Sequence, residues 1–164
     1  MKMKKTIFLL LICLGLGCVK PAFAQYTTGI GLRAGVTNGL TVKHFISQDA
    51  ALEGILHARW GGFMVTGLYE VHKDIRDVKG LQWFFGGGAH LGTWNTRNRN
   101  SRNRPPWAEP NTTYTVFGLN GIIGLDYAFQ DAPINLSLDW KPAINLGYYN
   151  YGWDEVALSI RFVF

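Results

Sequence analysis

The segment Val156–Phe164 reads VALSIRFVF, with an apolar side chain at every second position from Val156 to Phe164. This period of two is typical of a β-strand, because successive side chains of a strand point to opposite faces of its sheet. A frayed chain end would give the ring of Phe164 little to pack against. The pattern therefore predicts a strand whose final residues are held by a neighbouring strand.

Seven other segments alternate in the same way, and together with the last one they predict eight strands. They span residues 30–36, 40–46, 52–60, 63–71, 81–90, 117–129 and 134–148. The segment 40–46 is the weakest, because His44 interrupts its apolar face and Phe45 its polar face. Pro142 lacks the backbone donor that an inner strand needs, so we expect a bulge there, or a strand that has left the membrane.

The breaks between these segments are rich in Gly, Asn, Asp, Ser and Pro, which are typical turn residues. One connection is much longer than the others and spans Gly92–Tyr114. Neither a second domain nor an internal repeat is visible beyond the rhythm of strands and turns.

The N-terminal residues 1–24 have the order of a secretory signal peptide: lysines, an apolar run over 6–19, and the small residues Ala22 and Ala24 around a cleavage site. We expect cleavage after Ala24, leaving a barrel domain of residues 25–164. Removal of this segment takes four of sixteen basic residues and none of the eleven acids, so the net charge falls from +5 to +1. The chain's basicity thus belongs to targeting rather than to a nucleic-acid-binding surface.

Both cysteines, Cys13 and Cys18, lie in the segment expected to be removed, which excludes disulfides and Cys-ligated metals from the mature chain. The alternative is a lipoprotein cleavage box ending at Cys18. Gly15 stands where such boxes carry a Leu-like residue, so cleavage after Ala24 is the preferred interpretation.

The polar faces of the strands decide between a soluble and a membrane barrel. They are rich in Gly, which weakens a water-facing strand but suits a narrow lumen. They also carry five charges of each sign, as an enclosed space of low dielectric requires. These predicted lumen residues are Arg33, Lys43, Glu53, Arg59, Glu70, Asp126, Asp139, Lys141, Glu155 and Arg161.

The apolar faces carry aromatic residues near several strand ends, as in the aromatic girdles of membrane barrels. They include Trp60, Tyr69, Trp83, Tyr127, Phe129, Trp140 and Phe162. With a periplasmic N-terminus, the long connection between the fifth and sixth strands falls outside the cell, where such barrels keep their long loops. The expected fold is therefore an all-β, transmembrane, antiparallel up-and-down barrel of eight strands.

The pattern resembles the small eight-stranded barrels of Gram-negative outer membranes, of the OmpA/OmpX type, over roughly residues 26–164. In that family a final Phe, preceded by apolar residues at alternate positions, is read by the barrel-assembly machinery. The resemblance implies that Ile160, Phe162 and Phe164 form this assembly signal. It also implies an outer-membrane location, contact with outer-membrane lipid and a monomeric state.

Some small barrels are lipid-modifying enzymes that use a His with a Ser and a carboxylate. The histidines here are His44, His57, His72 and His90, of which His57 and His90 are predicted to point inward and His72 to lie at a turn. None stands in a His-x-Ser arrangement, and their spacing forms no metal site. We expect neither catalytic residues nor a cofactor.

The segment 97–104 is the only cluster of positive charge in the expected mature chain. Its composition is that of a solvated loop, and its alternative role is contact with lipopolysaccharide phosphates through Arg97, Arg99, Arg102 and Arg104. A nucleic-acid partner is not expected on an exported surface loop. The sequence favours a non-enzymatic barrel that serves envelope structure, surface contact or adhesion. A lipid-modifying enzyme of the same fold is the first alternative, and a soluble periplasmic barrel for an apolar ligand is the second.

Overall fold

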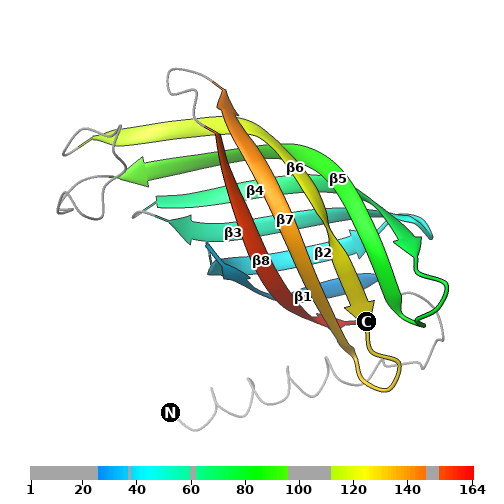
Figure 1. The fold of residues 1–164 in the computed structure, drawn as a ribbon. Coiled ribbons are helices and arrows are strands. Elements are labelled where there is room, and N and C mark those ends of the chain that lie inside the picture. The colour runs from blue at the N-terminus through cyan, green and yellow to red at the C-terminus, as the bar shows by residue number, and fades with distance from the viewer. Residues whose placement is uncertain (1–25, 37, 60–61, 96–111, 147–151) are drawn as a thin grey trace, which may run out of the picture.

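The computed structural model describes residues 26–36, 38–59, 62–95, 112–146 and 152–164. Eight strands form one closed sheet in which each strand pairs antiparallel with the next, as Figure 1 shows. They are β1 Thr28–Gly35, β2 Asn38–Phe45, β3 Ala50–Arg59, β4 Gly62–Asp74, β5 Leu81–Asn95, β6 Thr113–Ala128, β7 Ile134–Leu146 and β8 Gly152–Val163. The predicted all-β, eight-stranded barrel is confirmed.

The barrel closes where β8 pairs with β1, with Phe162 opposite Ile30 and Leu158 opposite Ala34. Beyond the end of β8, Phe164 still belongs to this ladder. Its backbone N–H donates to the carbonyl of Thr28 at 2.9 Å, and its carbonyl accepts from the Thr28 N–H at 3.0 Å. The closing strand therefore has no free edge, which accounts for the ordered pairing of an apolar segment up to its last residue.

Alternation along the strands divides the side chains into an apolar outer face and a mostly polar interior. Large apolar residues of every strand are exposed on the outside, among them Leu32, Leu40, Leu56, Phe63, Leu91, Leu119, Ile144 and Leu158. Among the described residues the interior also holds three apolar clusters, one of which lies on the wall of β3 to β6 and is formed by Ile55, Leu68, Phe84 and Ile122. In the part of the chain that the structure describes, no helix is long and apolar enough to cross a membrane.

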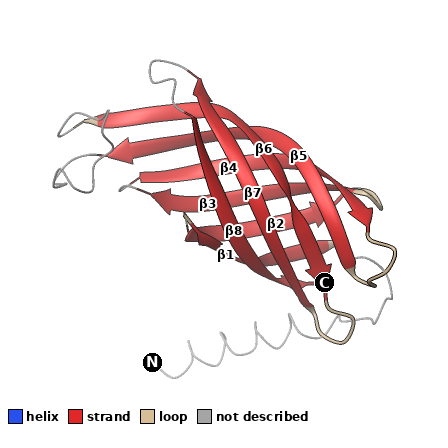
Figure 2. Cartoon of the chain, viewed as in Figure 1, coloured by secondary structure: helices blue, strands red, loops and turns tan. Residues whose placement is uncertain are grey.

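Short turns join the strands at the end of the barrel that holds Phe164, as Figure 2 shows. In the turn between β2 and β3, the N–H groups of Ile46 and Ser47 donate to the carbonyl of Ala50. Hydrogen bonds from Lys73 and Ser47 lower the pKa of the exposed Asp49 in this turn. Between β4 and β5, Gly80 has a φ of 83°, which favours glycine.

Several strands extend beyond their predicted ends, and the extensions of β5 and β6 pair with each other. β5 continues to Asn95 and β6 begins at Thr113, and the two pair over this extra length with Trp94 opposite Tyr114. The sequence pattern predicted that the long connection begins at Gly92. Pairing of β5 with β4 and β6 continues past this residue, so part of the predicted connection is strand.

The predicted bulge at Pro142 is wrong. The ladder between β6 and β7 is interrupted opposite Gly121 and Ile122, but it resumes in the same register, so no residue is inserted. On its other side Pro142 stays in register opposite Asp154 of β8. Gly121 leaves room for the proline ring, whose Cγ lies 3.4 Å from the position that a glycine Cβ would take.

Two glycines on opposite faces offer a matched test of how tightly the sheet is curved. A Cβ at Gly31 would lie 1.8 Å from the Ile160 carbonyl oxygen, whereas a Cβ at Gly67 would meet nothing within 4 Å. Gly31→Ala should therefore lower the free energy of unfolding by about 1–3 kcal/mol through displaced backbone at the β1–β8 closure. Gly67→Ala should leave it unchanged or slightly raised. Urea unfolding in detergent measures both, and equal effects would contradict the steric argument.

Candidate functional site

The interior of the barrel gathers the charged residues that the sequence placed on the polar faces. Nine of the ten are buried: Arg33, Lys43, Glu53, Glu70, Asp126, Asp139, Lys141, Glu155 and Arg161. The side chain of the tenth, Arg59, lies outside the described residues. Each lies on a strand whose every second side chain points inward, and the charged groups of these side chains meet in two clusters.

The first group, here the Arg33 cluster, consists of Arg33 on β1, Asp139 and Lys141 on β7, and Glu155 on β8. The Arg33 guanidinium donates to both Asp139 carboxylate oxygens at 2.6 Å, a bidentate contact that suits the planar shape of both groups. Glu155 accepts from Arg33 at 3.2 Å and lies 3.1 Å from the Lys141 ammonium nitrogen. Two cations thus face two carboxylates.

The second group, here the Lys43 cluster, consists of Lys43, Glu53, Glu70, Asp126 and Arg161, which come from five different strands. The Lys43 nitrogen lies 2.8 Å from Glu70, 3.3 Å from Glu53 and 3.5 Å from Asp126. The Arg161 guanidinium lies 2.6 Å from Glu53 and 3.8 Å from Asp126. Two cations therefore face three carboxylates.

Neutral polar groups complete the shell around Arg161. Its guanidinium donates to Asn135 at 3.1 Å, to Ser137 at 2.8 Å and to Thr41 at 3.2 Å. Bonds from one side chain on β8 thus reach β2, β3 and β7, which ties separate walls of the barrel together. Removal of one member of a buried network leaves a charged or polar group without its partner, which lowers stability. Each member of the network is therefore stabilised by the others.

Aromatic rings line the interior beside the Lys43 cluster. The Lys43 nitrogen lies 4.1 Å from the centre of the Phe84 ring, a cation–π contact. Phe84 stacks on His72 at 4.9 Å between ring centres, and Phe45 meets His72 edge-on at 4.7 Å. Phe84 was not singled out from the sequence. Its place between Gln82 and Gly86 on the inward face of the strand was the signal that could have found it.

Three of the four histidines are buried, and the bonds described for them join neighbouring residues of the barrel interior. His90 is buried between Asn120 and Asn145, at 2.7 and 2.9 Å, and His57 is also buried. The expectation that His72 lies at a turn is wrong. β4 continues to Asp74, and His72 is buried with its Nε2 atom 3.1 Å from Glu70. Pairing of His72 with Phe84 across β4 and β5 extends the strand over residues that resembled a turn.

His44 differs from the other three because it lies on the outer face. Its Nδ1 atom is 2.8 Å from the Thr28 hydroxyl of the neighbouring strand. Among the described residues, no carboxylate forms a hydrogen bond with His44, so the pair lacks the third member of a catalytic triad. No group of His, Cys, Asp and Glu in the described part of the chain could hold a metal ion.

Two solved structures resemble this barrel. The chain matches the N-terminal β-barrel domain of Pseudomonas aeruginosa OprF with a TM-score of 0.63 at 15% identity, over 84% of this chain and 95% of that one. It matches Neisserial surface protein A (NspA) with a TM-score of 0.52 at 11% identity, over 84% of this chain and 93% of that one. The fold is that of the small outer-membrane barrels.

No protein-family model and no curated protein matches this sequence. At such low identities the two solved structures establish the fold alone, so function is argued from this chain's own residues. The predicted phosphate contacts, Arg97, Arg99, Arg102 and Arg104, lie outside the described residues. The predicted assembly residues Ile160, Phe162 and Phe164 are described, and all three are exposed on the outer face.

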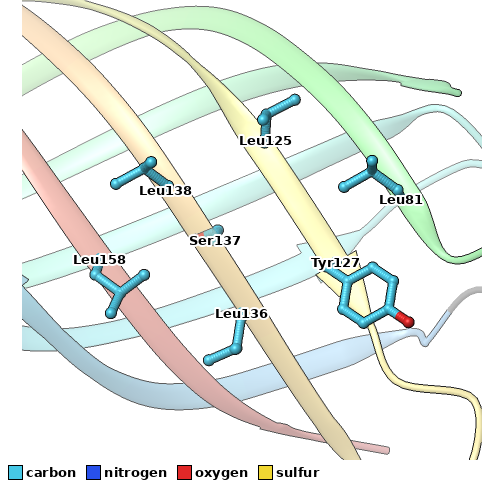
Figure 3. A pocket seen from close by; sticks show the side chains of 7 residues that line it. All are labelled: Leu81, Leu125, Tyr127, Leu136, Ser137, Leu138 and Leu158. Atoms are coloured by element: carbon cyan, nitrogen blue, oxygen red, sulfur yellow. The ribbon is translucent and has the colours of Figure 1, made fainter. Parts of the chain in front are cut away.

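The outer face of the barrel carries a shallow apolar depression across β5 to β8, with a volume of about 160 Å³. Figure 3 shows the leucine side chains that border it, among them Leu125, Leu138 and Leu158 from three neighbouring strands. Its lining holds no charged side chain. Its leucine-rich lining suits contact with hydrocarbon chains rather than catalysis.

Proposed function

We propose that this chain is an integral barrel of the Gram-negative outer membrane that serves envelope structure, surface contact or adhesion without catalysing a reaction. One observation carries the proposal: large apolar side chains are exposed around the whole barrel, while nine of the ten predicted lumen charges are buried inside it. A monomeric water-soluble protein rarely exposes a continuous apolar surface of this extent. Lipid acyl chains would cover such a surface at no cost in desolvation.

Fractionation of cells tests the location directly. The protein should be found in the outer-membrane fraction, and in unboiled detergent samples it should migrate on a gel differently from boiled ones. The shift is expected because a closed barrel keeps its hydrogen-bonded form in detergent until it is heated. Recovery in the soluble periplasmic fraction without a heat-dependent shift would contradict the proposal.

The enzymatic alternative is favoured by one observation, the pair formed by Thr28 and His44, because a nucleophile needs a base within hydrogen-bond reach. The absence of a described carboxylate partner favours a structural cross-strand pair instead. Incubation of the purified protein with outer-membrane lipids, followed by chromatography of the lipids, tests this alternative. Release of acyl chains by the parent, lost in Thr28→Val, would replace our proposal.

A soluble barrel for an apolar ligand would need an apolar, roomy interior. The described interior is instead crossed by ion pairs such as Arg161 with Glu53 and Arg33 with Asp139. An eight-stranded barrel is just wide enough for its own side chains, and these fill it. This arrangement supports the membrane barrel over the ligand carrier.

The partners that we propose follow from location and surface. Outer-membrane lipid would cover the apolar face, and the arginines of segment 97–104 would contact lipopolysaccharide phosphates. Ile160, Phe162 and Phe164 would be read by the barrel-assembly machinery during biogenesis. The closed sheet has no edge to share with another chain, which supports a monomer.

A filled lumen predicts a barrel that does not conduct. Pure protein in planar bilayers should show no large, steady conductance, because the buried side chains of Lys43 and Arg161 bond to groups on several strands and fill the narrow interior at their level. Single-channel recording provides the measurement, with detergent-only additions as the control. Porin-like currents from pure protein would mean that the lumen is less filled than these contacts imply.

A further inference from the structure

The two interior clusters differ in their balance of charge. The Arg33 cluster is neutral, because Arg33 and Lys141 face Asp139 and Glu155. In the Lys43 cluster, two cations face three carboxylates, so full ionisation would leave one negative charge in excess. All five side chains are at most 2% exposed, and an uncompensated charge in such an enclosed place is expensive.

Glu70 is the carboxylate with the weakest support. Arg161 reaches Glu53 and Asp126 but forms no ion pair with Glu70 among the described residues. The Oε2 atom of Glu70 receives Lys43 at 2.8 Å and lies 3.1 Å from His72, while its buried Oε1 atom accepts no hydrogen bond from a described residue. Glu70 is therefore the one carboxylate of the Lys43 cluster that pairs with only one of its two cations.

Glu53 is the neighbour that decides where a proton could sit. Its Oε2 atom, like Oε1 of Glu70, is buried and accepts no hydrogen bond from a described residue, and both carboxyl groups contact the Lys43 nitrogen, at 3.3 and 2.8 Å. Two ionised carboxylates have no hydrogen to share, whereas a proton on one of them would supply the donor that both oxygens lack. The surplus of negative charge and the missing hydrogen-bond donor thus both occur where Glu70 lies beside Glu53.

The other described groups around Glu70 supply no further positive charge. On the strands packed around it, the ionisable groups are Lys43 on β2, Glu53 on β3, His72 on β4, Asp126 on β6 and Arg161 on β8, with Tyr26 just before β1. Phe84 and Gly86 face it from β5, and Asn135 and Ser137 line the interior from β7.

We propose that the Lys43 cluster is a proton-binding site, in which the carboxyl group of Glu70 holds one proton and donates it in a hydrogen bond to Glu53. His72 then donates from Nε2 to the other Glu70 oxygen as a neutral ring. The bound proton balances the cluster, so that two cations face two carboxylates as in the Arg33 cluster. The site goes beyond the proposed envelope role, because it concerns the interior alone.

The sign of the pH effect follows from where the proton binds. The unfolded chain releases the Glu70 proton at the ordinary acidity of a glutamic acid, whereas the folded barrel keeps it to higher pH. The stability that it contributes is therefore full in acid and is lost as pH rises to the point where the folded barrel releases the proton.

Unfolding of the full barrel in detergent, followed in urea at several pH values, tests this site with Glu70→Gln. Above about pH 5, the unfolding equilibrium constant of the parent, relative to that of the variant, should rise about tenfold per pH unit until the folded parent releases its proton. Asp139→Asn in the neutral Arg33 cluster is the control, whose difference from the parent should not vary with pH in this way. A pH-independent difference between Glu70→Gln and the parent would overturn the proposal.

Infrared spectroscopy of the folded parent gives a second readout that does not depend on any variant's stability. At neutral pH it should show the carbonyl stretch of a protonated carboxylic acid, and this band should be absent from Glu70→Gln and present in Asp139→Asn. A parent without the band would overturn the proposal. So would a His72→Gln variant that loses the parent's pH dependence above about pH 7, because the proton would then belong to His72.

Discussion

Replacement of Arg161 by methionine should lower the free energy of unfolding by about 3–5 kcal/mol at neutral pH, the cost of breaking a buried ionic network. The side chain is buried and bonds to carboxylates and neutral groups on β2, β3 and β7. Without it, Lys43 alone faces Glu53, Glu70 and Asp126. Urea unfolding of the refolded variant in detergent, compared with the parent, measures the loss.

The exposed lysine Lys73 provides the matched control for Arg161. It pairs with Asp49 at 3.2 Å, but both side chains are more than half exposed, so Lys73→Met should change stability by no more than about 1 kcal/mol. The deficit of Arg161→Met should also shrink from about pH 8 to about pH 5, since protons can replace the missing cation. Equal losses in the two variants would mean that the lumen is solvated like the surface.

Replacement of Arg33 by methionine should lower the free energy of unfolding by a similar amount, about 3–5 kcal/mol, because it leaves the buried Asp139 without its bidentate partner. Asp139→Asn should do the same from the other side. The double variant keeps the pair of Lys141 and Glu155 and restores neutrality, so its loss should be smaller than the sum of the single losses.

The double-mutant cycle of Arg33 and Asp139 separates pairing from packing. A coupling of about 0.5–3 kcal/mol is expected for contacting residues, and it should appear in urea unfolding of all four proteins. Additive losses would show that the two side chains act independently, in disagreement with their 2.6 Å contacts.

The eight strands and their inward and outward faces could be predicted because they depend on a local rule. A period of two requires no knowledge of distant residues, so the inward side chains of Arg33, Glu53 and Arg161 follow from their neighbours in sequence. The errors occurred where local signals conflicted with pairing. His72 and Gly92 were predicted to lie in connections, yet His72 pairs with Phe84 of β5, and Gly92 pairs with both β4 and β6.

The members of the candidate site could likewise be named, but their partners could not. Arg33 and Asp139 are 106 residues apart, and Arg161 and Glu53 are 108 apart. The register of eight ladders and the curvature of the sheet decide which inward residues lie at the same height. Neither the register nor the curvature can be read from the alternation within a single strand.

The sequence by itself determined that this chain forms strands with an apolar and a charged face, because alternation and composition are properties of each segment. Only the tertiary structure decided that the charges separate into a neutral cluster and one with a carboxylate in excess. Counted along the sequence, the predicted lumen has five charges of each sign, and no surplus is visible. Closure of the barrel divides those charges in space, and electrostatic balance is set by distance rather than by totals.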